Sequence, residues 1–230
     1  MISYVIPALN EEGSIGEVIK RIRNIDSSGE IIVVDSDSTD RTAQIAKSMG
    51  AIVVNESRKG YGLAYKKGFA AATGDIIATL DADGTYPPEK VPDLLREIEK
   101  GYDFVTGERL KLASDEAMIP MHRVGNLILN IFTRLLFFVD IKDSQSGMWV
   151  FKSDVLKKIS PNGEGMEFSE EIKIRAAAQL CYTEIPIKYE RRMGEKKLRP
   201  WKDGIKNLLF LIKLRIKGGI RTKRAKCSQS

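Results

Sequence analysis

The stretch Gly74-Asp75-Ile76-Ile77-Ala78-Thr79-Leu80-Asp81-Ala82-Asp83 decides the fold. Its apolar part is rich in β-branched residues and predicts a buried strand. Pro87 and Pro88 follow, force the chain out of the strand and predict that a helix begins at Glu89. Asp81 and Asp83 therefore come at the carboxyl end of a strand, which is where open α/β sheets bind their ligands.

Asp81 and Asp83 are two positions apart, so in an extended chain both side chains point to the same side. Two carboxylates that close repel each other unless a cation lies between them or water screens them. The pair is thus either a divalent metal site or a solvated pair in a strand-to-helix loop. This stretch alone leaves both interpretations open.

Strands and helices alternate along the first half of the chain, which predicts parallel strands joined by right-handed crossovers. Ser14 and Glu17 have the spacing of a capping box at the start of the first helix. The predicted strands are 2–6, 30–34, 51–54, 74–79, 103–106, 148–151 and 184–189, and the predicted helices are 15–25, 40–49, 63–72, 89–100, 123–139, 168–180 and 201–217. The pattern predicts an α/β fold with a mostly parallel twisted sheet flanked by helices.

The residue content narrows the class of protein. A chain of 230 residues is long enough for one large α/β domain. The only cysteines, Cys181 and Cys227, lack CxxC spacing, and His122 is the only histidine, so cysteine zinc sites and histidine metal clusters are excluded. The cysteine content is compatible with a reducing compartment. Because the chain begins with a strand-like segment, we expect no signal peptide.

The net charge of +6 hides a strong asymmetry. Residues 191–226 contain 14 Lys and Arg against two acidic residues, so this end carries +12 and the remainder −6. Such basic segments usually meet nucleic acid, phosphates or anionic membrane. The most apolar run, 124–141, is interrupted by Asn126, Asn130, Arg134 and Asp140, so we expect no membrane-spanning helix.

A basic, glycine-containing segment, Arg58-Lys59-Gly60-Tyr61-Gly62, precedes the helix predicted at 63–72. Basic residues and glycines at a helix N-terminus suit a phosphate group, and a flexible connector explains them equally well. The dinucleotide-binding fingerprint GxGxxG is absent, because Tyr65 stands where the third glycine would be.

Several of these segments, taken in order, resemble the family 2 glycosyltransferases. They are Val5-Ile6-Pro7-Ala8-Leu9-Asn10-Glu11-Glu12, Val33-Val34-Asp35-Ser36-Asp37-Ser38, Lys59-Gly60-Tyr61-Gly62, and Ala72-Thr73-Gly74-Asp75 leading into Asp81-Ala82-Asp83. The second half resembles the dolichyl-phosphate hexose (mannose or glucose) synthases within that family. Its matching segments are Pro87-Pro88-Glu89, Gly107-Glu108-Arg109, Arg123, Ser146-Gly147 and Arg192-Met193-Gly194-Glu195-Lys196-Lys197-Leu198.

The resemblance implies a GT-A-type, Rossmann-like catalytic domain over residues 1–198. A basic amphipathic helix and tail, 199–230, would contact a membrane surface. The implied reaction is inverting transfer of a hexose from a nucleotide diphosphate sugar to a polyprenyl or dolichyl phosphate. It would use Mg²⁺ or Mn²⁺ and take place on the cytoplasmic face of the cell membrane, with no nucleic acid as partner.

The resemblance also assigns roles to individual residues. Asp81 and Asp83 would hold the metal, and they form the catalytic set together with Arg109 and Arg192. The nucleotide sugar would contact Pro7, Asn10, Glu11, Asp35, Lys59 and Asp81. The acceptor phosphate would contact Arg109, Arg123, Arg192 and Lys197.

Two departures from the family pattern fall on the donor side. Gly84-Thr85 replaces the Leu-Gln that many relatives have after the Asp-x-Asp, and Ser36 replaces a second Asp after Asp35. The donor is therefore left open between a UDP-hexose, which these departures favour slightly, and GDP-mannose.

Three alternatives come from other functions. A family 2 enzyme acting on a sugar or lipid hydroxyl would need a carboxylate base, for which Glu167 or Glu171 is available. A nucleic-acid-binding protein would use the basic C-terminal end, although no known nucleic-acid module is present. A sugar-1-phosphate nucleotidyltransferase would need a glycine-rich N-terminal loop, and Pro7-Ala8-Leu9-Asn10-Glu11 stands there instead.

Overall fold

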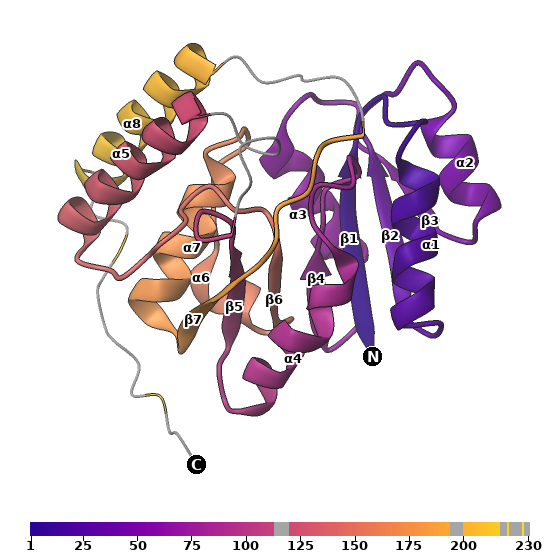
Figure 1. Cartoon of the computed structure of the whole chain (residues 1–230), viewed down its shortest axis with the longest axis horizontal. Coiled ribbons are helices and arrows are strands. Elements are labelled where there is room, and N and C mark those ends of the chain that lie inside the picture. Colours follow the sequence, from indigo (N-terminus) through magenta and orange to yellow (C-terminus); the bar gives the residue numbers. More distant parts are fainter. Residues whose placement is uncertain (113–119, 194–199, 217–219, 221–226, 228–230) are drawn as a thin grey trace.

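The structure is a computed structural model that describes residues 1–112, 120–193, 200–216, 220 and 227. Its centre is a seven-stranded sheet with the order β3-β2-β1-β4-β6-β5-β7 (Figure 1). The strands are β1 (Ile2–Ala8), β2 (Glu30–Asp35), β3 (Ile52–Asn55), β4 (Ile76–Thr79), β5 (Phe104–Glu108), β6 (Trp149–Lys152) and β7 (Tyr182–Pro186). The predicted α/β fold with a mostly parallel sheet is confirmed.

Strand direction is uniform except at β6. The pairs β1–β2, β2–β3, β1–β4 and β5–β7 are parallel, whereas β6 runs antiparallel to both β4 and β5. The sequence pattern did not predict this reversal, because strand direction depends on where the preceding helix and loop return to the sheet. The reversal brings the turn before β6 to the same edge of the sheet as the carboxyl ends of β4 and β5.

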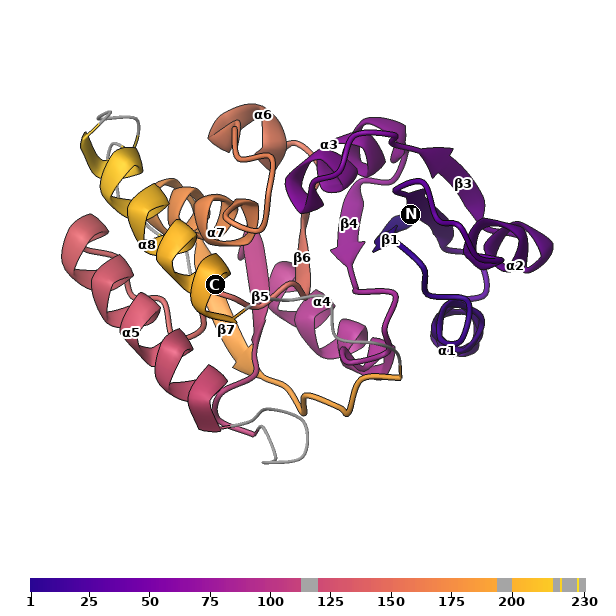
Figure 2. The same cartoon turned by 90° about the horizontal axis from the view of Figure 1, so that it is seen from above.

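Helices cover both faces of the sheet (Figure 2). They are α1 (Ile15–Ile25), α2 (Thr42–Ser48), α3 (Tyr61–Ala71), η1 (Pro88–Lys90), α4 (Val91–Glu99), α5 (Pro120–Phe137), α6 (Val155–Ile159), α7 (Phe168–Gln179) and α8 (Pro200–Ile216). The short α6 was not predicted. Residues 111 and 112 are described at the start of the loop before α5, and 113–119 lie outside the described residues.

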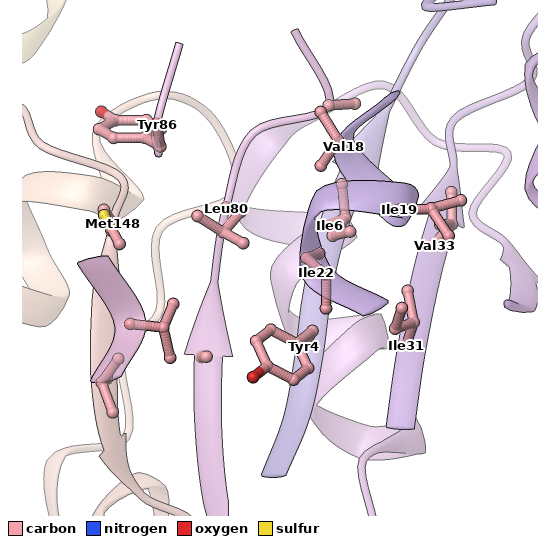
Figure 3. Packing of buried hydrophobic residues seen from close by; sticks show 14 of the residues in the cluster. Tyr4, Ile6, Val18, Ile19, Ile22, Ile31, Val33, Leu80, Tyr86 and Met148 are labelled. Atoms are coloured by element: carbon pink, nitrogen blue, oxygen red, sulfur yellow. The ribbon is translucent and has the colours of Figure 1, made fainter. Parts of the chain in front are cut away.

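Alternation along the central strands sends side chains to both faces, as expected for parallel strands buried on each side. Tyr4 and Ile6 of β1 pack with Ile19 and Ile22 of α1 on one face (Figure 3). Val5 points to the opposite face and belongs to a second cluster with residues of α3, α6 and α7. The sheet is therefore packed on both faces, and it supports the loops at its carboxyl edge.

Two expectations at the first loop are wrong. β1 does not stop before Pro7 but continues through it to Ala8, with Pro7 beside Val34. Ser14 makes no side-chain cap of α1; its hydroxyl donates to the backbone and side-chain oxygens of Glu11 instead. The capping-box spacing is present, but the Ser14 hydroxyl accepts no hydrogen bond from the first N–H groups of α1.

Helices α5 and α8 lie side by side beyond α7 (Figures 1 and 2). Their inner residues, including Leu129, Phe137, Leu211 and Leu214, form a third cluster with α7. Their outer surface keeps large apolar side chains in solvent: Val124, Leu127, Ile128, Ile131, Phe132 and Leu135 of α5, and Leu209, Ile212 and Ile216 of α8. These nine residues are called the outer apolar face below.

The outer apolar face shows that α5 is not a fully buried core helix, because Leu135 is 67% exposed. On α8, the exposed basic residues Lys206, Lys213 and Arg215 lie on the same helix as the exposed Leu209, Ile212 and Ile216. Within the part of the chain that the structure describes, no helix has both the length and the apolarity needed to cross a bilayer.

Candidate active site

The loops after β1 and β2 are joined by hydrogen bonds at the carboxyl edge of the sheet. Asn10 has a left-handed backbone with φ of 50°. Its N–H donates to the Ser38 hydroxyl at 2.9 Å, and its side-chain oxygen accepts from the N–H of Thr39 at 2.8 Å. The N–H of Glu11 donates to the Thr42 hydroxyl at 2.7 Å. Asn10 and Asp35, predicted to line one pocket, thus lie on two loops that are fixed to each other.

Asp35 is buried at the end of β2 and has one oxygen in use. Its Oδ2 accepts from the N–H of Ser38 at 3.2 Å. Its Oδ1 is buried and accepts no hydrogen bond from any residue that the structure describes. Since a buried oxygen without a donor is costly, Asp35 is suited to accept a hydrogen bond from a ligand.

Asp81 lies just after β4, next to Tyr61. The Tyr61 hydroxyl donates to Asp81 Oδ1 at 2.9 Å. Burial first, and the neighbouring Asp83 second, raise the pKa of Asp81 to about 7, while Arg192 and Arg109 act in the opposite direction. Asp81 is half-buried and Asp83 is buried, so the two carboxylates are not a freely solvated pair.

Asp83 is 5% exposed and is held by the residue two positions later. Both the N–H and the hydroxyl of Thr85 donate to Asp83 Oδ1, at 3.0 and 2.7 Å. Gly84 between them has φ of 76°, and a Cβ there would meet Met193 Cε at 2.2 Å. The departure Gly84-Thr85 therefore has a physical role, because the glycine permits the turn and the threonine orients the carboxylate.

The two aspartates fit a divalent cation that a diphosphate helps to bind. Elsewhere in the described residues, no cluster of three or more His, Cys, Asp and Glu side chains is arranged to hold a metal on its own. Mg²⁺ is commonly bound by one or two carboxylates, with substrate phosphates completing the coordination. Oxygen ligands, mutual repulsion and burial at Asp81 and Asp83 match that case.

Arg192 joins the first and the fourth strand ends. Its Nη2 donates to Glu11 Oε1 at 2.5 Å, and its Nη1 lies 2.9 Å from Asp83 Oδ2. The backbone around it is bound to the aspartate turn, with the N–H of Glu190 donating to Thr85 O and that of Met193 to Asp83 O. Residues 190–193 therefore form a strap over Asp83, and we keep that name below.

Arg109, at the end of β5, forms a buried ion pair with Asp143. Its Nε and Nη2 donate to the two carboxylate oxygens of Asp143 at 2.8 and 2.9 Å, and its backbone N–H donates to Oδ2 at 2.9 Å. The guanidinium also stacks on the Tyr189 ring, 5.2 Å from its centroid. Burial would raise the pKa of Asp143, but Arg109 holds it below its ordinary value. Arg109 is thus a cation fixed by Asp143 and Tyr189 at the end of β5.

The remaining predicted residues lie around this centre. Pro7 is half-buried in β1, Lys59 is exposed just before α3, and Arg123 is half-buried near the start of α5. Lys197 lies outside the described residues. The structure brings Glu11, Asp83 and Arg192 into direct contact.

Glu167 and Glu171, the alternative bases for a hydroxyl acceptor, accept hydrogen bonds from backbone N–H groups. Glu171 Oε2 accepts from the N–H groups of Asn162 and Gly163, and its Oε1 pairs with Arg175 at 2.7 Å. Glu167 Oε1 accepts from the N–H groups of Glu164 and Gly165. Both carboxylates therefore fix the loop before α7.

Sequence reasoning missed Asp143, Tyr61 and Lys173 as parts of the site. Asp143 was not singled out, and Tyr61 was seen only as part of the Lys-Gly-Tyr-Gly segment. Lys173 is fully buried in α7 and donates to the carbonyls of Asp143 and Ser146 at 2.8 and 2.7 Å. A lysine among the apolar residues of the helix predicted at 168–180 was the available signal.

A family model described as glycosyl transferase family 2 matches residues 3–160. The chain belongs to glycosyltransferase family 2. The match spans the strand ends that carry Glu11, Asp35, Asp83 and Arg109, whereas the strap with Arg192 lies beyond it.

Several curated relatives of this glycosyltransferase are archaeal proteins. It is 39% identical over 219 residues to the low-salt glycan biosynthesis hexosyltransferase Agl6 of Haloferax volcanii, covering 92% of this chain and 53% of that protein. It is 35% identical over 205 residues to a dolichyl-phosphate hexose transferase of the same organism, covering 88% and 89%. A dolichol-phosphate mannosyltransferase of Pyrococcus furiosus is 30% identical, covering 86% and 59%. The chain thus spans about half of Agl6 and most of the second relative.

Among solved structures, glucosyl-3-phosphoglycerate synthase of Mycobacterium tuberculosis has a similar fold. Its complex with Mn²⁺, UDP-glucose and phosphoglyceric acid superposes with a TM-score of 0.74 at 23% identity, covering 94% of this chain and 80% of that one. At this identity the likeness concerns the fold, which is the GT-A-like fold that the sequence resemblance implied.

Proposed function

We propose that this family 2 glycosyltransferase moves a hexose, with inversion, from a nucleotide diphosphate sugar to a polyprenyl or dolichyl phosphate. The observation that carries the proposal is the contact of Arg192 with both Glu11 and Asp83, at the same edge of the sheet as the buried Arg109–Asp143 pair. An acidic pair beside two fixed guanidinium groups suits a reaction that brings a diphosphate and a monophosphate close to each other. The names of the Haloferax and Pyrococcus relatives support the same acceptor class.

On the donor side, Asp83 with Asp81 would hold Mg²⁺ or Mn²⁺. The metal would neutralise charge on the leaving nucleotide diphosphate. Asp35, with its unpaired oxygen, would accept a hydrogen bond from the nucleoside, while Asn10, Glu11, Pro7 and Lys59 complete that subsite. The solved synthase that binds UDP-glucose with Mn²⁺ supports this arrangement.

On the acceptor side, the chemistry needs little proton transfer. A phosphate monoester has a second pKa of about 6 and is largely ionised at neutral pH. The residues must instead hold the anion, and arginine does so through bidentate hydrogen bonds. Arg109, Arg192, Arg123 and Lys197 are the proposed ligands. Because Glu167 and Glu171 are engaged with backbone N–H groups, a base for a hydroxyl acceptor is less well provided.

The outer apolar face of α5 and α8, with the basic residues of 199–230, would contact the membrane that contains the lipid acceptor. A basic surface with exposed apolar side chains binds anionic bilayers through shallow insertion plus roughly 1 kcal/mol per Lys or Arg near the surface. We place this contact on the cytoplasmic face. The chain would be peripheral there, with residues 1–198 as the catalytic domain.

The test is an acceptor panel with the purified chain, Mn²⁺ and either labelled UDP-glucose or labelled GDP-mannose. Polyprenyl phosphate and the matched polyprenol, each in phosphatidylglycerol vesicles, are compared with a soluble sugar alcohol. We expect label only on the phosphate acceptor. Label on the polyprenol or the sugar alcohol would support the hydroxyl-acceptor alternative and contradict the proposal.

A thermal-shift panel identifies the donor base. UDP, GDP, CDP and dTDP are added in turn with Mn²⁺, because a ligand of the native state raises its unfolding temperature. We expect the largest shift with UDP, followed by GDP, and a smaller shift when Mn²⁺ is omitted. Equal shifts with all four nucleotides would contradict base recognition by Asp35.

A further inference from the structure

The loop 142–147, between α5 and β6, is bound directly to both halves of the site. Asp143 carries the carboxylate that holds Arg109. Gly147 packs against Asp81, and a Cβ at this glycine would lie 2.5 Å from the Tyr61 hydroxyl and 3.5 Å from Asp81 Oδ1. The N–H of Gly147 donates to the Tyr86 hydroxyl at 2.7 Å. A shift of this loop therefore moves Arg109, through Asp143, together with Gly147, which packs against Asp81.

Helix α5 holds the first part of this loop through a buried amide. Asn130 is 3% exposed, although it stands in the most apolar run of the chain. Its Nδ2 donates to Lys142 O at 2.5 Å, and its Oδ1 accepts from the N–H of Ser144 at 2.8 Å. Both polar groups of this side chain are thus bound to loop backbone.

Helix α8 holds the same loop through a second buried amide. Asn207, 5% exposed, donates from Nδ2 to Gln145 Oε1 at 3.0 Å. Gln145 in turn donates from Nε2 to Glu170, and its backbone N–H donates to Asp143 Oδ1 at 3.2 Å. The path from α8 to the Arg109–Asp143 pair is therefore two hydrogen bonds long.

The underside of the loop is fixed by α7. Lys173 donates to the carbonyls of Asp143 and Ser146, and Ser169 donates to Ser146 O at 3.0 Å. On the side of the loop that faces α5 and α8, the hydrogen bonds of Asn130 and Asn207 therefore set its position. An amide buried without its partner costs about 1–3 kcal/mol, so α5 and α8 pack well in only one register relative to the loop.

We propose that Asn207, acting through Gln145, is a positioning residue that holds loop 142–147 and so aims Arg109 at the acceptor phosphate. The same two helices present the outer apolar face on their other side, so the surface proposed to meet the membrane and the acceptor subsite share one rigid connection. This inference rests on the proposed function for its kinetic consequence. The structural part of the inference, that Asn207 fixes the loop, is independent of the proposed function.

The test uses Asn207→Leu, which keeps the side-chain volume and removes the amide. Amide hydrogen exchange of Ser144, Gln145 and Gly147 is measured in the full chain by mass spectrometry. We expect exchange about tenfold faster at these amides and unchanged at β1 and β2, because loss of one buried hydrogen bond lowers local stability by about 1.4 kcal/mol, which is a factor of ten. The KM for polyprenyl phosphate should rise by about tenfold while the KM for the nucleotide sugar stays within about twofold of wild type.

Three further variants keep the test sharp. Gln145→Leu should give the same acceptor defect, and the double variant should be no worse than either single one, because both remove one connection. Leu211→Ala, which removes a buried side chain from the same helix, should lower the unfolding temperature without raising the acceptor KM.

The outcomes separate the two ideas. Unchanged exchange in the loop of Asn207→Leu overturns the inference, as does an acceptor KM in Leu211→Ala raised as much as in Asn207→Leu. Faster exchange with an unaltered acceptor KM also overturns it. If the wild type transfers no sugar to polyprenyl phosphate, the proposed function fails, and the exchange rates still decide whether Asn207 fixes the loop.

Discussion

Nη1 of Arg192 lies 2.9 Å from Oδ2 of Asp83, so an arginine from the strap occupies the carboxylate expected to bind a metal. Arg192 also donates to Glu11, and its Nε is buried without a hydrogen bond to any described residue. A metal ion bound at Asp83, as proposed, would therefore compete with the guanidinium for the same oxygen. Binding of metal and donor would release Arg192 toward the acceptor phosphate.

This competition predicts the effect of Arg192→Gln. Removal of the positive charge next to Asp83 should strengthen Mn²⁺ binding in the absence of nucleotide by about tenfold, because two like charges a few ångströms apart near a protein surface repel by a few kcal/mol. Calorimetric titration with MnCl₂ measures this. Arg191→Gln, at the exposed neighbouring position, is the matched control and should leave the affinity unchanged. Equal or weaker Mn²⁺ binding in Arg192→Gln would contradict the competition.

The Arg109–Asp143 pair predicts a strongly coupled double-mutant cycle. Arg109→Met leaves a buried carboxylate uncompensated and should lower the free energy of unfolding by about 3–5 kcal/mol. Arg109→Met combined with Asp143→Asn should recover most of that loss, since the unpaired charge is gone. Urea unfolding of the four proteins at pH 7 measures the coupling. Additive losses would show that the pair is not a unit.

The same pair predicts acid sensitivity. Arg109 holds the pKa of Asp143 below its ordinary value of 3.8, so the ionised carboxylate stabilises the fold above that pH. This stability is lost as the pH falls below about 3.8 and through the lowered pKa of the folded state. In the double variant this component of the acid loss should be absent. Identical acid unfolding profiles of wild type and double variant would contradict the assignment.

The strands and loops around these groups could be predicted from the sequence, but the contacts between distant segments could not. Strand ends, the Asp81–Asp83 pair and the Asn10–Glu11 loop follow local patterns, because apolar alternation and proline positions are short-range signals. The contacts of Arg192 with Glu11 and of Asn207 with Gln145 join distant segments, which no spacing rule encodes. The capping box at Ser14 failed for a local reason, because the Ser14 hydroxyl is turned toward Glu11, three residues earlier.

The environment of Glu170 predicts that replacing this residue with a neutral one raises the stability of the fold in a pH-dependent way. Burial raises the pKa of this carboxyl to about 8 from an ordinary value of 4.5, with Lys173 and Glu167 as the charged groups that face it. Between pH 4.5 and 8 the unfolded chain has lost the proton and the folded chain keeps it, so Glu170 lowers stability as the pH rises.

Glu170→Gln should therefore be nearly as stable as wild type at pH 5 and more stable at pH 8, by on the order of a few kcal/mol. Thermal unfolding at both pH values measures the difference. Glu164→Gln, at an exposed position on the preceding loop, serves as control. A constant difference between Glu170→Gln and wild type across this pH range would contradict a buried, protonated Glu170.

The outer apolar face predicts salt-resistant membrane binding. Replacing Leu135 and Leu209 by Gln should weaken co-sedimentation with phosphatidylglycerol vesicles at both low and high salt, because exposed leucines act by insertion. Truncation after Leu198 should weaken binding strongly, and raised salt should weaken wild-type binding only in part. The unfolding temperature of the Leu135/Leu209 variant should stay near wild type, since both side chains are in solvent. Unchanged co-sedimentation of both proteins would place the membrane contact elsewhere.

The most direct measurement is sugar transfer by Asp83→Asn, which keeps the oxygen that Thr85 binds and removes the charge. Labelled nucleotide sugar, Mn²⁺ and polyprenyl phosphate vesicles are mixed with wild type or variant, and the label in the organic phase is counted. We predict rapid, EDTA-sensitive labelling by wild type and a loss of about a thousandfold in Asp83→Asn at an unaltered unfolding temperature. Transfer by the folded variant at the wild-type rate would contradict a catalytic site at the carboxyl edge of β4.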